Sequence, residues 1–187
     1  MVVINPGNPT GQVLSRDNIQ SLILLAHRHN IMILADEVYQ NNIYGERPFI
    51  SFRKVLAELG APYNNEVELI SYHSVSKGLL GECGLRGGYM EFKNLPKTAE
   101  DTLYKLKSIE LCSNTLGQFA VQLMVNPPEV GPQSDACVIQ YLKEYNQHKN
   151  GLAERAKLLT DTFNTMTNVT CTEIQGAMYA FPQLHFS

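Results

Sequence analysis

The sequence places a lysine, Lys77, in an unusual setting within the stretch SYHSVSKGLLGECGLRGGY, residues 71–89. Two serines, Ser74 and Ser76, stand shortly before it, and Arg86 follows nine residues later in a glycine-rich segment. A lysine amine is a nucleophile when it is neutral, and a nearby cation together with burial favours that form. We therefore expect Lys77 to hold a ligand through its amine.

Other polar side chains follow the predicted strands of the chain. Open parallel sheets bind ligands outside the carboxyl ends of their strands, where the connecting loops meet. Residues after three predicted strands therefore form one candidate site. They are Asn8 after the first strand, Asp36 and Tyr39 after the second, and Ser74, Ser76 and Lys77 after the third, with Arg86 as a fixed positive charge.

This set of side chains suits a cofactor that carries a phosphate, a phenolic oxygen, a basic ring nitrogen and an aldehyde. Pyridoxal 5′-phosphate (PLP) has all four groups. The expected contacts are Asp36 with the pyridine nitrogen, Asn8 and Tyr39 with the 3′-oxygen, Ser74, Ser76 and Arg86 with the phosphate, and Lys77 with the aldehyde as a Schiff base.

Each residue also has a simpler interpretation on its own. Asp36 is explained equally well as a turn or helix-capping residue, and Lys77 as a solvated charge. Residues 74–77 spell the S-x-x-K motif of serine acyl transferases, but the companion motifs S-D-N and K-T-G are absent. The glycines lack the pattern of a nucleotide-binding loop, and the histidines lack metal-ligand spacing, so we expect no metal. The shared position of the candidate residues after successive strands favours the cofactor site.

The elements that must position these residues alternate in the first half of the chain. Short apolar runs predict strands at residues 2–4, 31–35, 67–73 and 87–92. Apolar residues at helical spacing predict a helix that begins after the N-cap Ser15, and a second helix near residues 50–60. This order indicates an α/β fold with a mainly parallel sheet and flanking helices.

The second half is mainly helical. We expect helices around residues 103–111 and 119–125, and a long helix over about 134–166. Two short strands, VTCTEI and GAMYAF, are predicted near the end. A strand that begins at residue 2 and another that stops close to residue 187 suggest a fragment of a longer chain.

Composition excludes several classes of partner. The chain has 187 residues, 44% of them hydrophobic, and a formal net charge of −3, which argues against a nucleic-acid partner. No apolar run approaches the roughly 20 residues that a membrane span needs, so we expect no membrane partner. The four cysteines are widely spaced and indicate reduced thiols in a cytosol-like compartment.

Four motifs, NPGNPTG, ADEVYQNNIY, SVSKGLLGECGLRGGY and GAMYAFP, together resemble the fold-type I PLP-dependent aminotransferases of class I/II. Within that class, the chain is similar to the alanine aminotransferase subgroup. The resemblance implies that residues 1–140 are the C-terminal portion of the PLP-binding large domain. It implies that residues 141–187 are a linking helix and the start of a truncated small domain.

The resemblance also implies a reaction and repeats the residue roles given above. Lys77 matches the lysine that forms the Schiff base and moves a proton at the α-carbon of the substrate. The implied exchange converts L-alanine and 2-oxoglutarate into pyruvate and L-glutamate with ping-pong kinetics. We expect a homodimer in the full-length protein and a cytoplasmic or mitochondrial location, with any targeting region outside this chain.

Two groups that the family requires are absent from these residues. They are an upstream aromatic residue that stacks on the cofactor ring and a downstream arginine that binds the substrate α-carboxylate; no arginine follows Arg155. We therefore expect this chain alone to be poorly active or inactive. The alternatives are another fold-type I PLP enzyme, such as a β-lyase or an aminocyclopropane-carboxylate synthase, and a non-catalytic remnant that acts as a binding module.

Overall fold

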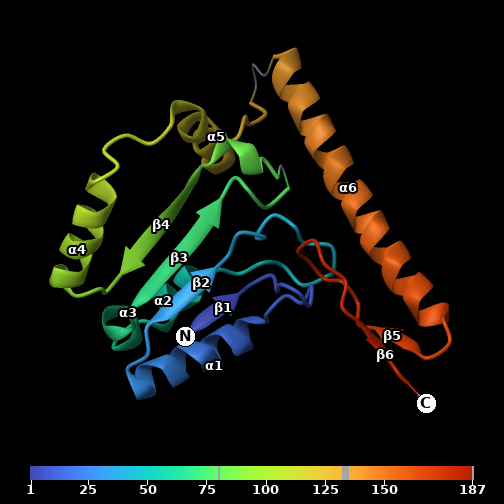
Figure 1. Ribbon diagram of the computed structural model, residues 1–187, viewed down its shortest axis with the longest axis horizontal. Helices are drawn as coiled ribbons and strands as arrows, with labels where there is room; N and C mark the ends of the chain where they lie inside the picture. Colours follow the sequence, from blue (N-terminus) through green and yellow to red (C-terminus); the bar gives the residue numbers. More distant parts are fainter. Residues whose placement is uncertain (80, 132–134, 187) are drawn as a thin grey trace.

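The computed structural model describes residues 1–79, 81–131 and 135–186, and structural statements below refer to these residues (Figure 1). A four-stranded sheet in the order β1-β2-β3-β4 forms the centre. Its strands are β1 (Val2–Ile4), β2 (Ile33–Asp36), β3 (Leu69–Ser74) and β4 (Gly88–Lys93). The first three strands are parallel, and β4 is antiparallel to β3. The predicted α/β fold with a mainly parallel sheet is confirmed.

Helices flank this sheet and extend beyond it. They are α1 (Arg16–His29), α2 (Phe52–Leu59), α3 (Tyr63–Glu66), α4 (Lys97–Ser108), α5 (Thr115–Val125) and α6 (Ala136–Thr165), with a short 3₁₀ helix, η1, at Cys83–Leu85. In Figure 1, α6 runs as a separate rod that ends beside the two-stranded sheet of β5 (Val169–Cys171) and β6 (Pro182–Leu184). None of the helices in the described part combines the length and apolar character that a membrane crossing requires.

The sequence of α1 shows why it forms where it does. The Ser15 side chain accepts a hydrogen bond from Asn18 N, and the Asn18 side chain accepts one from Ser15 N, which completes a capping box. The helix ends at Asn30, whose φ of 50° is left-handed. Between these two ends, apolar residues at helical spacing turn one face of α1 towards the sheet.

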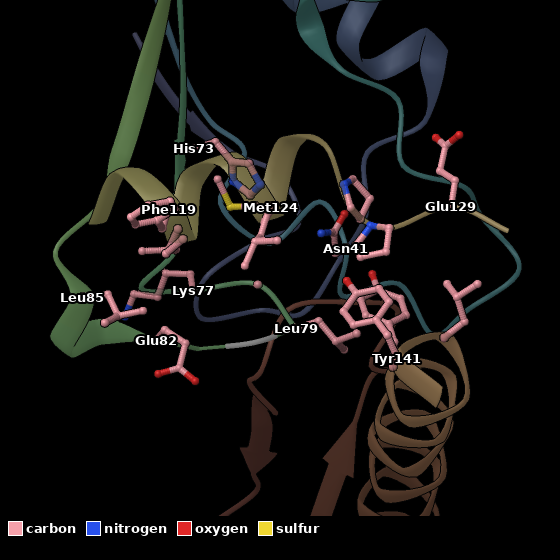
Figure 2. A pocket seen from close by; sticks show the side chains of 18 of the residues that line it. Asn41, His73, Lys77, Leu79, Glu82, Leu85, Phe119, Met124, Glu129 and Tyr141 are labelled. Atoms are coloured by element: carbon pink, nitrogen blue, oxygen red, sulfur yellow. The ribbon is translucent and has the colours of Figure 1, made fainter. Parts of the chain in front are cut away.

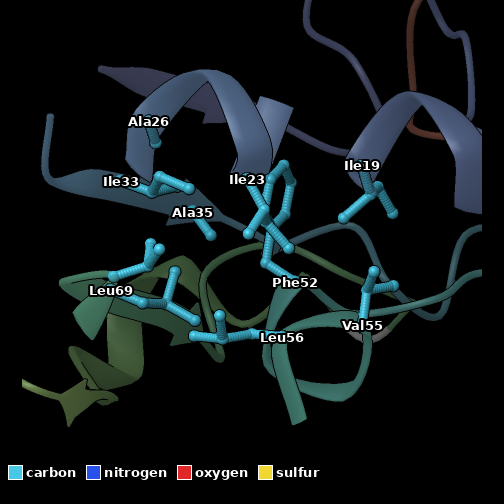
Figure 3. Close-up of a cluster of buried hydrophobic side chains, with 10 residues drawn as sticks. Ile19, Ile23, Ala26, Ile33, Ala35, Phe52, Val55, Leu56 and Leu69 are labelled. Carbon is cyan, nitrogen blue, oxygen red and sulfur yellow. The ribbon is translucent and has the colours of Figure 1, made fainter. Parts of the chain in front are cut away.

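One hydrophobic core joins that face to the sheet and to α2 (Figure 3). Ile33 and Ala35 of β2 and Leu69 of β3 contribute to it, because successive side chains of a strand point to opposite faces. The buried members are Ile19, Ile23, Ala26, Ile33, Ala35, Phe52, Val55, Leu56, Val67 and Leu69.

The same alternation fixes the register of the two central strands. Ile33 pairs with Leu69, and Asp36 pairs with Tyr72. A slip of one residue would move the apolar side chains out of the core. The carboxyl ends of β2 and β3 therefore reach the same edge of the sheet.

Some predicted boundaries differ from those of the structure. The strand expected at residues 31–35 is Ile33–Asp36, so Asp36 is the last residue of the strand and does not follow it. The expected start of the long helix near residue 134 lies outside the described residues, and α6 is seen from Ala136.

The strand predicted for GAMYAF was wrong. Residues 176–181 make one isolated bridge, between Gly176 and Ile43, and the second strand of the small sheet is Pro182–Leu184. The backbone of this segment hydrogen-bonds to loops of the central sheet, with Gly176 N donating to Gly11 O. It is therefore not available to pair with β5.

A buried carboxyl group, Glu37, connects the end of β2 to α2. Glu37 is 5% exposed, and its Oε1 accepts a hydrogen bond of 2.8 Å from Phe52 N, the first residue of α2. Burial raises the pKa of Glu37 to about 7, against the opposing effect of that hydrogen bond. The folded chain therefore favours the neutral acid at this position.

This pKa predicts how stability depends on pH. Because the folded-state pKa of about 7 exceeds the ordinary value of 4.5, the folded state binds more protons in that window, and stability falls as pH rises through it. Glu37→Gln keeps an oxygen acceptor for Phe52 N and removes the titration. Relative to the wild type, the variant should gain up to about 3 kcal/mol of unfolding free energy between pH 4.5 and 8. Urea unfolding of both proteins at pH 4.5 and at pH 8 measures this gain. If the difference in unfolding free energy between the variant and the wild type were the same at both pH values, the raised pKa of Glu37 would be contradicted.

Candidate active site

The end of β3 and the loop after it gather two hydroxyl groups and a guanidinium group. The Ser74 hydroxyl donates to Gly87 O at 3.1 Å and accepts from Ser76 N at 3.1 Å. Arg86 Nη1 donates to Ser76 Oγ at 3.4 Å and to Cys83 O at 3.1 Å. The structure therefore brings together the three residues expected to bind a phosphate, in an arrangement that can hold an anion.

The backbone of Arg86 is supported by a residue that sequence reasoning did not identify. Arg86 closes η1 with a left-handed φ of 52°. Asn114 Nδ2 donates to Leu85 O at 3.1 Å and to Arg86 O at 3.2 Å, while Asn114 Oδ1 caps α5 by accepting from Gly117 N at 2.7 Å. Asparagine before an apolar helix signals an N-cap, but nothing in the sequence indicates a contact with Arg86.

Lys77 follows Ser76 in the chain and lines a large cavity. The lysine is half-buried, and the next residue, Gly78, has a φ of +67°, which lets the loop turn at this point. The cavity has a volume of about 980 Å³ and is lined by the Lys77 loop, α5, residues 127–130 and α6. Figure 2 shows Lys77 and Glu82 on one side of it and Tyr141 of α6 on the other. The Lys77 side chain is therefore accessible to a ligand of moderate size.

His73 also lines this cavity. Its ring packs edge-on against Tyr89, with 5.9 Å between the ring centroids. The side chain is 7% exposed, and Nδ1 has no hydrogen-bond partner in the described part of the chain. Burial lowers the pKa of His73, so its imidazole is neutral at pH 7, although the charge of Asp36 acts in the opposite direction.

Asp36 and Tyr39 lie at the end of β2. Asp36 is half-buried, and its Oδ1 accepts a hydrogen bond of 3.4 Å from Val38 N. Tyr39 is 2% exposed, and its hydroxyl lies 2.6 Å from the Tyr179 hydroxyl, a partner that the sequence did not predict. Burial and this hydrogen bond raise the pKa of Tyr39, with smaller contributions from Asp36 and Cys83.

Asn8 is not among the predicted site residues that hydrogen-bond to one another, which are Ser74, Ser76 and Arg86. It is exposed in the turn after β1, and its side chain has no hydrogen bond among the described residues. The neighbouring Asn5 is buried instead: its backbone N donates to Asp36 O at 3.0 Å, and its Oδ1 accepts from Leu14 N at 2.9 Å. Asn5 therefore connects this turn to the end of β2.

Comparisons with known proteins identify the family of the chain. The sequence profile of the family described as Aminotransferase class I and II matches residues 1–186. The chain is 50% identical over 185 residues to Glutamate–glyoxylate aminotransferase 1 of Arabidopsis thaliana. It is 49% identical over 186 residues to Probable alanine aminotransferase, mitochondrial, of Dictyostelium discoideum. Both matches cover 98% of this chain but 38% and 34% of those proteins, so the chain spans about a third of their length.

Solved structures show the same fold. The alanine aminotransferase from Pyrococcus furiosus matches with a TM-score of 0.78 and 30% sequence identity, covering 100% of this chain and 42% of that one. An aspartate aminotransferase from Rhizobium meliloti matches with a TM-score of 0.72 at 19% identity and supports the fold alone.

Asn114 both caps α5 and supports the Arg86 loop, so its substitution should affect ligand binding as well as stability. Asn114→Ala removes the cap of α5 and both hydrogen bonds to the Arg86 loop, so the free energy of unfolding should fall by about 1–2 kcal/mol. If PLP binds at this site, its dissociation constant should rise several-fold, because Arg86 loses its support.

Ser51→Ala is the matched control for Asn114→Ala, because Ser51 caps α2 and is not among the residues that form the candidate site. It should cost comparable stability without weakening PLP binding. Equal weakening by both variants, measured by absorbance titration, would show that Asn114 acts only through overall stability.

Proposed function

Because the chain belongs to the class I and II aminotransferases, we propose that it binds PLP at the Lys77 site and transfers amino groups between amino acids and 2-oxo acids. The observation that carries the proposal is the placement of Ser74, Ser76 and Arg86 next to the half-buried Lys77, with Asp36 at the end of the adjacent strand. An anion site, an amine and a carboxylate at one edge of the sheet fit the phosphate, aldehyde and ring nitrogen of PLP.

When bound, PLP supplies an aldehyde and a ring that accepts electrons from the α-carbon of an amino acid. Lys77 would hold that aldehyde through its amine, and the same amine would serve as the base that moves the proton at the α-carbon. Arg86 and the two serine hydroxyls hold the phosphate by charge-assisted hydrogen bonds. The Asp36 carboxylate keeps the ring nitrogen protonated, and Tyr39 and Asn8 are the proposed partners of the 3′-oxygen.

For the substrates, we propose L-alanine and 2-oxoglutarate, converted into pyruvate and L-glutamate. Relatives named alanine aminotransferase support this choice at 44–49% identity. A second pair, L-glutamate and glyoxylate, is favoured by the 50% identity to the Arabidopsis protein named for that reaction. Measuring kcat/KM for 2-oxoglutarate and for glyoxylate, each with L-alanine as the amino donor, separates the two pairs. A higher value for 2-oxoglutarate favours the first pair, and a higher value for glyoxylate favours the second.

We further propose that turnover depends on groups beyond those of this chain. Residues 156–187 contain no arginine to bind a substrate carboxylate. We propose that residues 1–140 form the cofactor-binding part and residues 141–187 lead into a second domain. We also propose that the full-length protein is a homodimer of the cytoplasm or the mitochondrion; one relative is named as mitochondrial.

The covalent role of Lys77 predicts a spectroscopic result. Mixing the chain with PLP should give a yellow species, and Lys77→Arg should abolish it, because a guanidinium keeps the charge but does not condense with the aldehyde at neutral pH. Lys143→Ala, which removes an exposed lysine of α6, is the control and should leave the absorbance unchanged. A Lys77→Arg protein that turns as yellow as the wild type with PLP, or that retains as much reduced pyridoxyl group after borohydride treatment and dialysis, would remove Lys77 from the mechanism.

The carboxylate of Asp36 should affect the rate more than the stability. In a full-length enzyme that carries these residues, Asp36→Ala should raise the barrier by about 3 kcal/mol, the order of one preorganised electrostatic contact. Asp36→Glu, which keeps the charge, should restore part of the activity. Near-normal kcat/KM in Asp36→Ala would exclude a role for this residue on the ring nitrogen.

A further inference from the structure

A segment from the far end of the chain is bound firmly to the loops of the candidate site. This segment, residues 173–179, is called the clamp segment below. Gln175 N and Gly176 N both donate to Gly11 O at 2.9 Å, and Gln175 O accepts from Tyr44 N at 2.8 Å. These backbone hydrogen bonds connect the clamp segment to the loop after β1 and to the loop after β2.

Two glycines make the close approach possible. A Cβ on Gly176 would lie 2.6 Å from Asn42 O, and a Cβ on Gly11 would lie 2.8 Å from Tyr179 O. Gly11 also has a φ of +67°, which L side chains rarely adopt. The backbone of the clamp segment is therefore held in one position against both loops.

The result of this packing is a contact between two tyrosines that are 140 residues apart in the sequence. The hydroxyls of Tyr39 and Tyr179 lie 2.6 Å apart, and the two rings meet edge to face with 5.6 Å between centroids. We propose that Tyr179 is a positioning residue of the site, whose hydroxyl fixes the phenol of Tyr39 for contact with the 3′-oxygen of the cofactor. The identity of the cofactor in this inference rests on the proposed function. The contact between the two tyrosines does not depend on it.

The chemistry of a phenol allows this arrangement. A tyrosine hydroxyl has one proton and two acceptor lone pairs, so Tyr39 can bond to Tyr179 and to a ring oxygen at the same time. Because Tyr39 has a single proton, it accepts from Tyr179 when it donates to the ring oxygen. Burial raises the pKa of Tyr39, which favours the protonated phenol at neutral pH. Tyr179 acts only through Tyr39 in this account.

The first test uses the chain without any cofactor. With ¹³Cζ-labelled tyrosine, Tyr179→Phe should shift the NMR resonance of Tyr39, because the substitution removes the hydrogen bond between the two hydroxyls. The control is Tyr44→Phe, which removes a hydrogen bond of 2.8 Å to Ala177 O in the same clamp segment but leaves Tyr179 intact. An unchanged Tyr39 resonance in Tyr179→Phe, or an equal shift in Tyr44→Phe, would overturn the proposal.

The second test measures the dissociation constant for PLP in a double-mutant cycle. Tyr179→Phe should weaken binding by roughly 3- to 10-fold, the effect of one hydrogen bond, and should cause no further loss in a Tyr39→Phe background. Equal losses in both backgrounds would show that Tyr179 does not act through Tyr39, and would overturn the proposal. If the wild-type chain shows no PLP adduct at all, the proposed function fails, and the NMR comparison still decides whether Tyr179 positions Tyr39.

Discussion

The parallel pairing of β2 with β3 is the constraint on which the rest of the site depends. Asp36 is in register with Tyr72, so the carboxylate ends one strand at the edge where the Lys77 loop leaves the next. Ile33, Ala35 and Leu69 fix that register, because a slip of one residue would expose them to water. Burial of these apolar side chains, which do not touch the ligand site, thus sets the spacing of the reactive groups.

Two adjacent carboxyl groups at this edge take different roles because their surroundings differ. Glu37 is buried against the first residue of α2, and burial raises its pKa to about 7. Asp36 stays half-buried at the end of the strand, where its carboxyl group can meet a ligand. The fold uses Glu37 to dock α2 and leaves Asp36 for the site. A similar division holds for the tyrosines, since Tyr44 bonds to the backbone of Ala177 while Tyr179 bonds to the hydroxyl of Tyr39.

Local signals in the sequence predicted much of this architecture. Apolar runs indicated the strands, the N-cap Ser15 indicated α1, and the order of polar residues after the strands indicated the site. Contacts between distant segments could not be predicted, because no periodic pattern encodes them: examples are Asn114 on the Arg86 loop and Tyr179 on Tyr39. The strand predicted over residues 176–181 was wrong for the same reason, since its backbone bonds to Gly11 and Asn42.

The central claim is that Lys77 is the residue that binds PLP covalently. Borohydride reduction of the chain mixed with PLP, followed by proteolysis and mass spectrometry, locates the modified lysine directly. The account predicts that the pyridoxyl group is found on the peptide that contains Lys77, and that its yield there exceeds that on exposed lysines such as Lys54 and Lys157. A label spread over exposed lysines, with none on Lys77, would contradict it.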